Sequence, residues 1–486
     1  MPERQAPAFA DREDAAVIAG SLRDAGYTQD AVAGLLDFSG LAAPPEQLDA
    51  LRARAAENTA LALHARLWFL GDTVPVADAR AHLTDLERWA SAGLLRVQGE
   101  DVVPEVAITA RHDLFIVADT PAEVRTGAPV DHVMGPAQST VLVERAMVEA
   151  PMASCLDLGT GSGYLALRAA AHTEAVTATD VNERAVAMTC FNAQLNGVEN
   201  INVLNGSLYE PVADRQFDLI VCSPPYVISP GDGLMFCESG WRGDLFCRQL
   251  LRQAAGHLAD GGLCQAVCNW GHGADQSWQD TIAEWFNDLG CDAMVLGGDW
   301  QDAADYATNW IRDTRARGAD TFEREHPRWM AYFESEGIEK VSYGVVTLRR
   351  RTGDNWVQCE PAPAQFGEGS GNDIVRRMNL RDYLERTPDG ALLDDVVVVA
   401  PGLQMAVPEE SDANRILRQR RGLIQDIAVD PNIAGLIERC TGNSPLRDTL
   451  QAIAKELGVP FDQFAPMALA TVRGLVGQGI LQPATM

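Results

Sequence analysis

One stretch, CLDLGTGSGYLALRAAAH at residues 155–172, constrains the fold of this chain more than any other. An apolar run leads into glycines at alternating positions, Gly159, Gly161 and Gly163, and a helix-forming segment follows. Glycine has no Cβ, so it allows a tight turn and lets a ligand approach the backbone. In doubly wound sheets, ligands bind at the carboxyl ends of the strands. The stretch therefore predicts a strand, a turn and a helix of an open α/β sheet, with a ligand site near Asp157.

The rest of the central region continues this alternation. Between about 137 and 350, apolar runs typical of buried strands alternate with helical patterns, which favours a parallel sheet. The predicted strands are CLDLG, AVTATD, INVLNG, FDLIVC, GGLCQAVC, CDAMVLG and SYGVVTLRR. The predicted helices are AVAMTCFNAQLNG, DLFCRQLLRQAAGHLADGG and an aromatic-rich insert at 300–336. We therefore expect an α/β fold with a Rossmann-like, doubly wound sheet.

The spacing of the acidic residues and the glycines distinguishes between cofactors. Dinucleotides are bound by GxGxxG, with the pyrophosphate at a helix N-terminus. Here the spacing is GxGxG, and Asp157 lies two residues before the first glycine, where its carboxylate would repel a pyrophosphate. That carboxylate suits an ammonium group, and Asp180, at the end of AVTATD, can accept both hydroxyls of a ribose. We expect S-adenosyl-L-methionine, which has an amino-acid tail, a ribose and no phosphate, rather than NAD.

DLGTGSG and TATD together resemble motif I and the acidic strand end of class I S-adenosylmethionine-dependent methyltransferases, over roughly residues 130–350. The resemblance implies that the methionine end of the cofactor lies at the glycine loop and the ribose at Asp180. Ser207 stands where many relatives have an aspartate that meets the adenine amino group, so nearby backbone or Leu208 would replace that contact. The cofactor-binding residues implied are Asp157, Gly159, Thr160, Gly161, Gly163, Asp180, Val181, Ser207 and Leu208.

A second motif, Ser223-Pro224-Pro225-Tyr226, ends the apolar run FDLIVC. Proline donates no backbone hydrogen bond and does not fit inside a sheet, so the strand stops here. Amide and exocyclic amino nitrogens are poor nucleophiles, and acceptors for their N–H groups help to direct the lone pair toward an electrophile. The Pro224 carbonyl and the Ser223 hydroxyl would be these acceptors. Pro225 would fix the loop and the ring of Tyr226 would stack on the substrate, so we expect all four residues to be catalytic.

This motif is similar to the (N/D/S)PP(Y/F) motif of amino-methyltransferases, which modify either a glutamine amide of release factors or amino groups of nucleic acid bases. SPPYVISP is most similar to the NPPYV run of the release-factor glutamine methyltransferase (HemK/PrmC-like) group, with Ser223 in place of Asn. The resemblance implies a protein glutamine N-methyltransferase, with a translation factor as one possible substrate. The alternatives are a ribosomal or transfer RNA base methyltransferase, a small-molecule methyltransferase and a non-catalytic module that binds S-adenosylmethionine.

Two segments rich in Pro and Gly, at 120–136 and 360–373, indicate domain boundaries. We expect a helical, winged-helix-like domain at 1–125, a methyltransferase domain at 126–352 and a small α/β or winged-helix-like domain at 353–486. A helix ending near Gly93 and two short strand-like runs after it give the order of a winged-helix module. Such modules bind nucleic acid, or they serve as docking or dimerisation domains.

The formal charge of −29 repels nucleic acid phosphates unless a basic patch overrides it. An RNA target predicts that Arg349–Arg351 or Arg418–Arg421 gather on one face with the site. The ten cysteines form no CxxC pair, so we expect reduced thiols and no metal. We also expect a cytoplasmic protein with no membrane partner, since no apolar run reaches the roughly 18 residues of a membrane span and the N-terminus lacks a secretory signal.

Two segments flank the predicted site. The loop at 231–244 follows the SPPY motif directly and forms either a lid or substrate wall or a plain surface connection. Its candidate residues are Glu238, Trp241, Arg242 and Asp244. Upstream, VDHVMGPAQST at 130–140 precedes the first strand of the sheet. The resemblance implies that this segment crosses over the cofactor, so Asp131 and His132 could reach the site. His132 is a candidate base there, and the alternative is a buried or surface histidine without a catalytic role.

Overall fold

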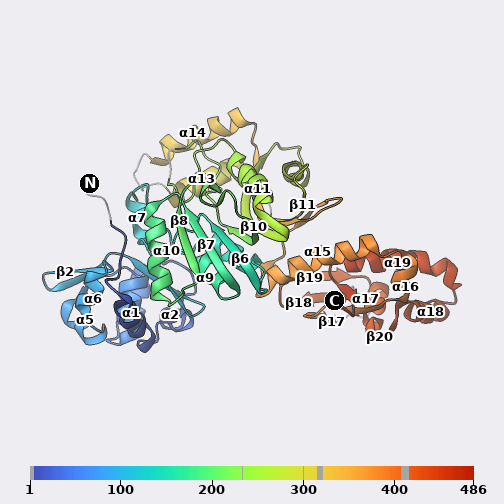
Figure 1. Cartoon of the computed structure of the whole chain (residues 1–486), viewed down its shortest axis with the longest axis horizontal. Coiled ribbons are helices and arrows are strands. Elements are labelled where there is room, and N and C mark those ends of the chain that lie inside the picture. The colour runs from blue at the N-terminus through green and yellow to red at the C-terminus, as the bar shows by residue number, and fades with distance from the viewer. Residues whose placement is uncertain (1–4, 232–233, 299, 315–320, 407–414) are drawn as a thin grey trace. The chain divides into compact units, whose positions relative to one another are not determined.

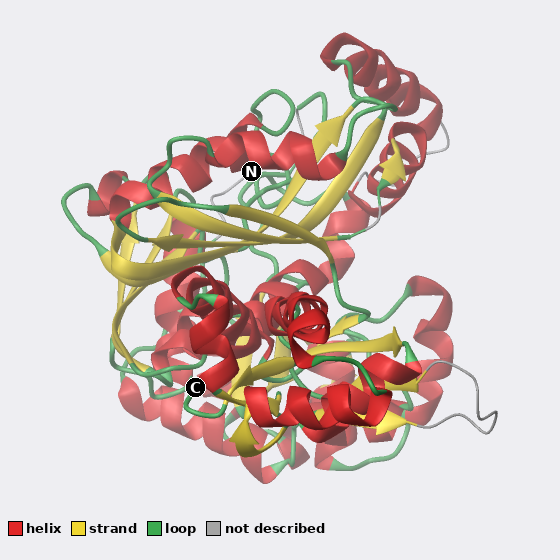
Figure 2. Cartoon of the chain, turned by 90° about the vertical axis from the view of Figure 1, so that its right-hand side faces the viewer, coloured by secondary structure: helices red, strands yellow, loops and turns green. Residues whose placement is uncertain are grey.

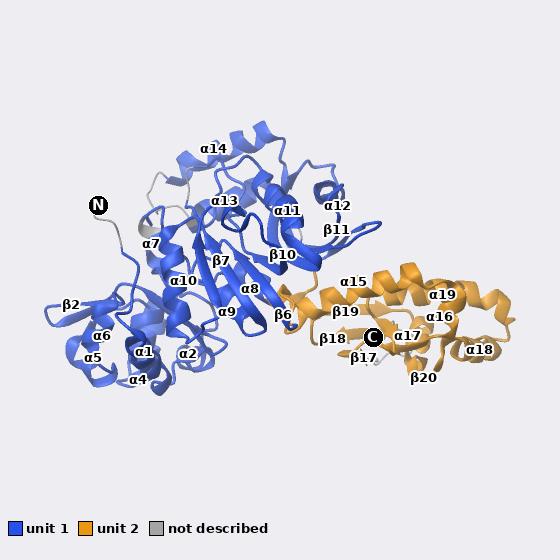
Figure 3. Ribbon diagram, in the orientation of Figure 1, with its two compact units in different colours: residues 1–144, 150–361 blue, residues 145–149, 362–486 orange. Residues whose placement is uncertain are grey.

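The computed structural model describes residues 5–231, 234–298, 300–314, 321–406 and 415–486. The chain divides into two compact units, the first formed by residues 1–144 and 150–361 and the second by residues 145–149 and 362–486 (Figure 3). Both units mix helices with strands (Figure 2). No described helix is both long enough and apolar enough to cross a membrane. All ten cysteines are free thiols, as their scattered spacing predicts.

A nine-stranded sheet forms the centre of the first unit (Figure 1). Its order is β14-β11-β13-β10-β9-β6-β7-β8, and the short β12 pairs with β13. The strands from β8 to β10 are parallel, whereas β13 runs antiparallel to β10 and β11. Every strand that the sequence predicts here is present. Their bounds are β6 Met152–Leu158, β7 Thr173–Asp180, β8 Ile201–Asn205, β9 Phe217–Cys222, β10 Leu258–His272, β11 Cys291–Gly297, β12 Gln301–Asp302, β13 Lys340–Arg350 and β14 Val357–Pro361.

Helices follow the strands in the βα order that a doubly wound sheet requires. Leu156 and Leu158 of β6 pack with Leu250 and Leu251 in one buried cluster, so the even positions of β6 face α11. The aromatic insert is helical, as predicted, and forms α13 and α14. The bounds are α8 Gln138–Ala146, α9 Tyr164–Ala170, α10 Glu183–Leu195, η3 Glu210–Val212, α11 Leu245–His257, α12 Trp278–Ala283, η4 Glu284–Phe286, α13 Ala303–Thr314 and α14 Thr321–Glu336.

The N-terminal segment is mostly helical and has two small antiparallel sheets, β1-β3-β2 and β4-β5. The hairpin β2–β3 directly follows α6, which is the order that the sequence predicts. The bounds are α1 Arg12–Asp24, α2 Gln29–Leu36, η1 Pro45–Gln47, α3 Leu48–Arg54, α4 Ala60–His64, η2 Ala65–Phe69, β1 Val74–Pro75, α5 Val76–His82, α6 Leu86–Ser91, β2 Leu95–Gln98, β3 Asp101–Pro104, β4 Ala107–Arg111, β5 Leu114–Ala118 and α7 Pro121–Thr126.

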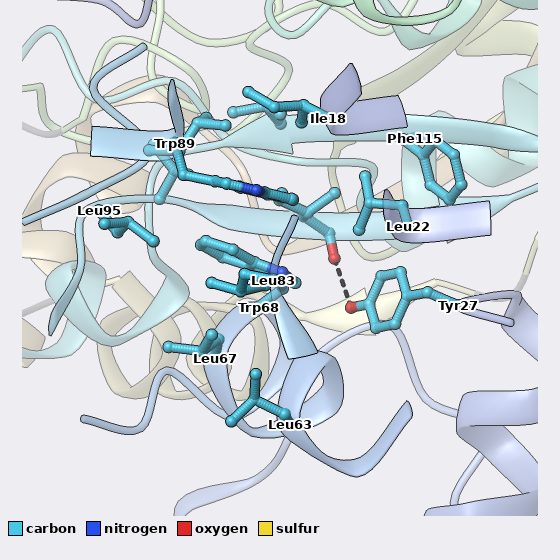
Figure 4. Close-up of a cluster of buried hydrophobic side chains, with 14 of the residues drawn as sticks. Ile18, Leu22, Tyr27, Leu63, Leu67, Trp68, Leu83, Trp89, Leu95 and Phe115 are labelled. Atoms are coloured by element: carbon cyan, nitrogen blue, oxygen red, sulfur yellow. Dashed lines mark hydrogen bonds between the residues drawn. The ribbon is translucent and has the colours of Figure 1, made fainter. Parts of the chain in front are cut away.

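The core of this segment is built around two stacked indoles (Figure 4). The rings of Trp68 and Trp89 lie 5.0 Å apart and nearly parallel, and both side chains are fully buried. The Tyr27 hydroxyl donates to the Ile108 carbonyl at 2.7 Å, so this buried hydroxyl is satisfied (Figure 4). The N-terminal helices and the β4–β5 hairpin therefore share one core.

That core continues into the large sheet through α10. The buried face of α10 belongs to the same hydrophobic cluster and consists of Ala185, Met188, Phe191 and Leu195. The side-chain amide of Asn192 bonds both backbone groups of Val117, at 2.8 and 2.9 Å, and Asn196 does the same to Phe115 at 2.8 Å. The side chains of two asparagines thus satisfy the backbone N–H and C=O groups along one edge of β5, which a neighbouring strand would otherwise bond. Residues 1–125, predicted as a separate domain, are therefore grouped with the sheet in one unit.

The second unit contains helices and two sheets, β15-β19-β18-β17 and β20-β16-β21. The predicted start at 353 is too early, because β14 pairs with β11 and so belongs to the first unit. The bounds are β15 Gln365–Phe366, α15 Ser370–Arg386, α16 Asp389–Asp394, β16 Val396–Val399, β17 Leu403–Ala406, β18 Arg415–Gln419, β19 Leu423–Val429, α17 Pro431–Arg439, β20 Thr441–Pro445, α18 Leu446–Leu457, α19 Phe461–Gly477 and β21 Leu481–Pro483.

Candidate active site

A cavity of about 480 Å³ opens at the carboxyl ends of β6, β7 and β9. This is the edge of the sheet where the sequence places the ligand site. The cavity wall also includes the loops after these strands, the segment before α8 and one turn of α13. The predicted site residues on the wall are Gly159, Thr160, Gly161, Asp180, Val181, Ser207, Leu208, Ser223, Pro224, Pro225 and Tyr226.

The three glycines of the loop have different surroundings. Gly159 and Gly161 have φ angles of +72° and +55°, and a Cβ added to either would meet no atom within 4 Å. Both line the cavity, so their missing side chains leave room for a ligand. Gly163 also has a positive φ, of +81°, but it is absent from the wall, and a Cβ there would lie 2.8 Å from Thr189 Cγ2. Gly163 therefore allows α9 to pack against α10.

Asp157 lies beneath the loop and not on the cavity wall. Its Oδ2 accepts hydrogen bonds from the Thr160 hydroxyl at 2.6 Å and the Ala166 amide at 2.9 Å, while Oδ1 has no hydrogen-bond partner among the described residues. Burial raises the pKa of Asp157 to about 7, despite these two donors. The carboxyl group thus ties the glycine loop to the first turn of α9.

Asp180, at the end of β7, faces the cavity. Its Oδ2 accepts from the Gly161 amide and its Oδ1 from the Asn182 amide, each at 2.9 Å. A carboxylate has about four lone-pair sites, so each oxygen can accept one more hydrogen bond. Burial raises the pKa of this carboxyl group. The two backbone donors fix the carboxylate beside the glycine loop.

Val181, Ser207 and Leu208 line the part of the cavity beyond Asp180. Val181 is 58% exposed, so it offers an open apolar surface at the cavity edge. Leu208 has a φ of +47°, which is unusual for a residue with a branched side chain. The turn after β8 therefore holds an apolar side chain on the cavity wall.

The SPPY motif follows β9 directly and places all four residues on the wall. The Ser223 hydroxyl donates to the Ser139 hydroxyl at 3.4 Å. The ring of Tyr226 meets Trp310 of α13 edge to face, with ring centres 6.1 Å apart. Tyr226 also forms an isolated antiparallel bridge with Glu238. The corner is thus in contact with α8, with α13 and with the loop that follows the motif.

The loop at 231–244 is partly a wall of the cavity, as predicted, and partly a connection. Glu238 and Trp241 line the cavity. Arg242 instead forms an ion pair with Glu336 of α14 at 2.6 Å, and Asp244 accepts from the Gly271 amide at 3.2 Å. Two of the four predicted residues therefore face the cavity, while the other two attach the loop to its surroundings. Residues 232 and 233 lie outside the described residues.

His132 and Asp131 also differ from each other. His132 is buried, lines the cavity and has its Nδ1 3.2 Å from Glu123 Oε2. Its Nε2 has no hydrogen-bond partner among the described residues. Asp131 is not on the wall, and its backbone carbonyl accepts from Arg184 at 2.9 Å.

Glu123, His132 and Asp119 could together hold a cation, but the carboxylate of Asp119 already pairs with Arg184 through two bonds of 2.8 Å.

The first arginine cluster has a structural role. Arg349 forms a 2.7 Å ion pair with the buried Asp292, and Arg351 forms one of 3.0 Å with the same carboxylate. Arg350 donates to the Leu258 carbonyl at 2.8 Å. These contacts tie β13 to β11 and β10. The arginines of 349–351 are therefore committed to the fold, and no cluster of them gathers at the described part of the cavity wall.

The second arginine cluster lies in the second unit. Arg418 pairs with Asp426 at 3.4 Å and Arg421 with Glu368 at 3.7 Å. Long, exposed ion pairs of this kind contribute little to stability, about 0–1 kcal/mol. They also lower the net positive charge that this surface would offer to a phosphate.

Several residues of the cavity wall were not predicted from the sequence. Ser139 lies in the segment 130–140, which was identified only through Asp131 and His132, and Trp310 lies in the aromatic insert. The described wall also carries the carboxylates of Asp180, Glu238 and Asp313 and includes no Lys or Arg. The cavity is thus acidic and partly aromatic.

Comparison with known proteins agrees with this arrangement. Residues 136–290 match the family model described as the methyltransferase small domain, and residues 24–105 match a domain of unknown function (DUF7059). The chain is 32% identical over 167 residues to a ribosomal protein uL3 glutamine methyltransferase of Bradyrhizobium diazoefficiens, covering 31% of this chain and 50% of that protein. It is 33% identical over 163 residues to a release factor glutamine methyltransferase of Salmonella typhimurium, covering 32% and 55%.

The chain spans about half the length of the curated relatives it matches. The matched residues contain the glycine loop, Asp180 and the SPPY motif. The resemblance to the release-factor glutamine methyltransferase (HemK/PrmC-like) group, inferred from those motifs, is therefore confirmed for the central region of the chain.

Proposed function

We propose that this protein is an S-adenosylmethionine-dependent N-methyltransferase that modifies the side-chain amide of a glutamine in a protein. One observation carries the proposal: a single cavity joins the glycine loop and Asp180 to the SPPY corner. The residues present fit the cofactor, because Gly159 and Gly161 leave open space and the buried carboxylate of Asp180 keeps acceptor capacity for hydroxyl groups.

The residues around the loop have separate roles in this proposal. Asp180 would accept the ribose hydroxyls, and the backbone of 159–161 would lie along the amino-acid end. Val181, Ser207 and Leu208 would surround the adenine ring. Asp157 and Gly163 lie off the wall, so they act by holding the loop in place. When bound, S-adenosylmethionine supplies an electrophilic methyl group on a sulfonium.

The SPPY corner would prepare the substrate nitrogen. The Pro224 carbonyl and the Ser223 hydroxyl accept the two amide N–H groups, which directs the lone pair toward the methyl group. The amide nitrogen would receive the methyl group from the sulfonium, whose sulfur would leave as a neutral thioether. The nitrogen would then release one N–H proton to solvent, so no dedicated base is needed. The ring of Tyr226, supported by Trp310, stacks on the planar amide. Burial raises the pKa of Tyr226, which keeps its hydroxyl protonated at neutral pH.

A protein substrate is supported by charge and by similarity. The described cavity wall has three carboxylates and no Lys or Arg, and the chain carries a net charge of −29, both unfavourable for a phosphate backbone. The matched relatives are named for glutamine methylation of ribosomal protein uL3 and of release factors. We propose a protein of translation as the partner and the cytoplasm as the location.

The test uses purified protein, methyl-labelled S-adenosylmethionine and a lysate of source cells that lack this gene. The expected result is label that survives ribonuclease, is lost to protease and maps to a glutamine by mass spectrometry. Pro225→Ala should abolish transfer, whereas Pro230→Ala, in the same loop but off the wall, should not. Label removed by ribonuclease would identify an RNA methyltransferase instead, and label only in small metabolites would indicate a small-molecule substrate. Cofactor binding without transfer would indicate a non-catalytic binding module.

A further inference from the structure

The presence of a serine at the first position of the SPPY motif creates a chemical requirement. A carboxamide oxygen is only an acceptor, but a hydroxyl carries one donor proton as well as two lone pairs. A Ser223 proton directed into the cavity would face the substrate N–H, or would bond the substrate nitrogen and compete for its lone pair. Ser223 can assist the reaction only if its hydroxyl donates a hydrogen bond to another group, away from the substrate.

Ser139 provides such a group. It is the second residue of α8, lies on the cavity wall and accepts the hydrogen bond that Ser223 donates at 3.4 Å. Hydrogen bonds in catalytic sites are often long without substrate and tighten in the complex. Ser139 reaches Ser223 although it lies 84 positions earlier in the chain.

We propose that Ser139 is a positioning residue that accepts a hydrogen bond from the Ser223 hydroxyl, so that Ser223 presents only lone pairs to the substrate N–H group. The inference rests on the proposed function and explains how a serine can stand in for the asparagine of the NPPY motif. Pro224 and Pro225 complete the arrangement, because neither has a backbone donor. The substrate nitrogen then meets two acceptors and no donor at this corner.

A double-mutant cycle tests this pairing. Ser139→Ala should lower kcat about tenfold, the effect of losing roughly one hydrogen bond's worth of transition-state stabilisation. The KM for the protein substrate and the Kd for S-adenosylmethionine should stay within about twofold, since the interaction matters mainly in the transition state. Ser139→Thr keeps the hydroxyl and should restore activity. Gln138→Ala, on the same helical turn but off the wall, is the matched control.

The decisive variant is Ser223→Asn, whose carboxamide oxygen needs no proton acceptor. In that background Ser139→Ala should change kcat by less than about twofold, so the two substitutions should be strongly non-additive. Equal losses in both backgrounds would show that Ser139 acts through Tyr226 or through α8, and would overturn the proposal. No loss in the natural background would overturn it as well.

A second measurement is independent of the substrate. Neutron diffraction on deuterated protein should place the Ser223 deuteron on the line to Ser139 Oγ. A deuteron pointing into the cavity would overturn the proposal even if methyl transfer were fast. If the protein transfers no methyl group to any amide, the proposed function fails, while the neutron density still decides the direction of this hydrogen bond.

Discussion

Replacing Gly163 by alanine tests whether the third glycine of the loop serves the fold and not the cofactor. Its φ of +81° lies in the left-handed region, and a Cβ there would lie 2.8 Å from Thr189 Cγ2 and 3.0 Å from Thr189 Oγ1. Thr189 is fully buried, and its hydroxyl donates to the Gly161 carbonyl at 3.1 Å. The β-branched side chain is stiff and has no room to move away.

The expected cost combines two effects. A residue with a Cβ in the left-handed region costs about 1–2 kcal/mol. Overpacking a filled interior typically adds about 1–3 kcal/mol. Gly163→Ala should therefore lower the free energy of unfolding by about 2–5 kcal/mol, a large part of the roughly 5–15 kcal/mol that stabilises a typical protein.

Urea unfolding monitored by circular dichroism, together with calorimetric titration of S-adenosylmethionine, separates the two kinds of glycine. Gly161→Ala has the same backbone strain but no clash, so it should lose about 1–2 kcal/mol of stability and about tenfold or more in cofactor affinity. In the Gly163→Ala background, Thr189→Ser removes the clashing methyl group. It should therefore restore the part of the free energy of unfolding that is lost to overpacking. If Gly163→Ala unfolds like the unmodified protein, or if Thr189→Ser recovers nothing, the packing argument is refuted.

Three further outcomes are expected. The raised pKa of Asp157 means that the folded state keeps a proton that the unfolded state releases, so the free energy of unfolding should fall as pH rises from about 4 to about 7 and level off above. Asp157→Asn should flatten that slope in a urea series across pH. Arg349→Ala removes one of the two arginines paired with the buried Asp292 and leaves Arg351 in place, so it should cost about 1–3 kcal/mol in the same assay, and an unchanged midpoint would contradict its structural role. Tyr226→Ala removes the ring and should lower kcat/KM for methyl transfer about tenfold, the effect of losing stacking worth about 1–1.5 kcal/mol. Tyr226→Phe keeps the ring and should retain more of kcat/KM. Equal losses in the two variants would exclude stacking.

The sequence by itself determined the features that depend on the local backbone. The glycines of 159–163 specified the turn between strand and helix, and the double proline of 224–225 specified where β9 ends. Alternating apolar runs predicted the strands β6 to β11 and β13, and the aromatic insert was expected to be helical, as α13 and α14 are; the short β12 at the start of that insert was not predicted. Because parallel strands carry their ligand sites at their carboxyl ends, these local features also located the cavity.

The tertiary structure decided which way each residue faces and what it meets. Gly161 borders the cavity while Gly163, two residues later, meets Thr189. Asp157, which was expected to bind the cofactor, lies below the glycine loop and off the cavity wall. Ser139 reaches Ser223 only because the first turn of α8 lies beside the loop that follows β9. Local spacing fixes backbone conformation, but contacts between residues many positions apart depend on how whole elements pack. For that reason the chemistry of the SPPY corner could be predicted from four adjacent residues, whereas its orienting partner could be found only in the folded molecule.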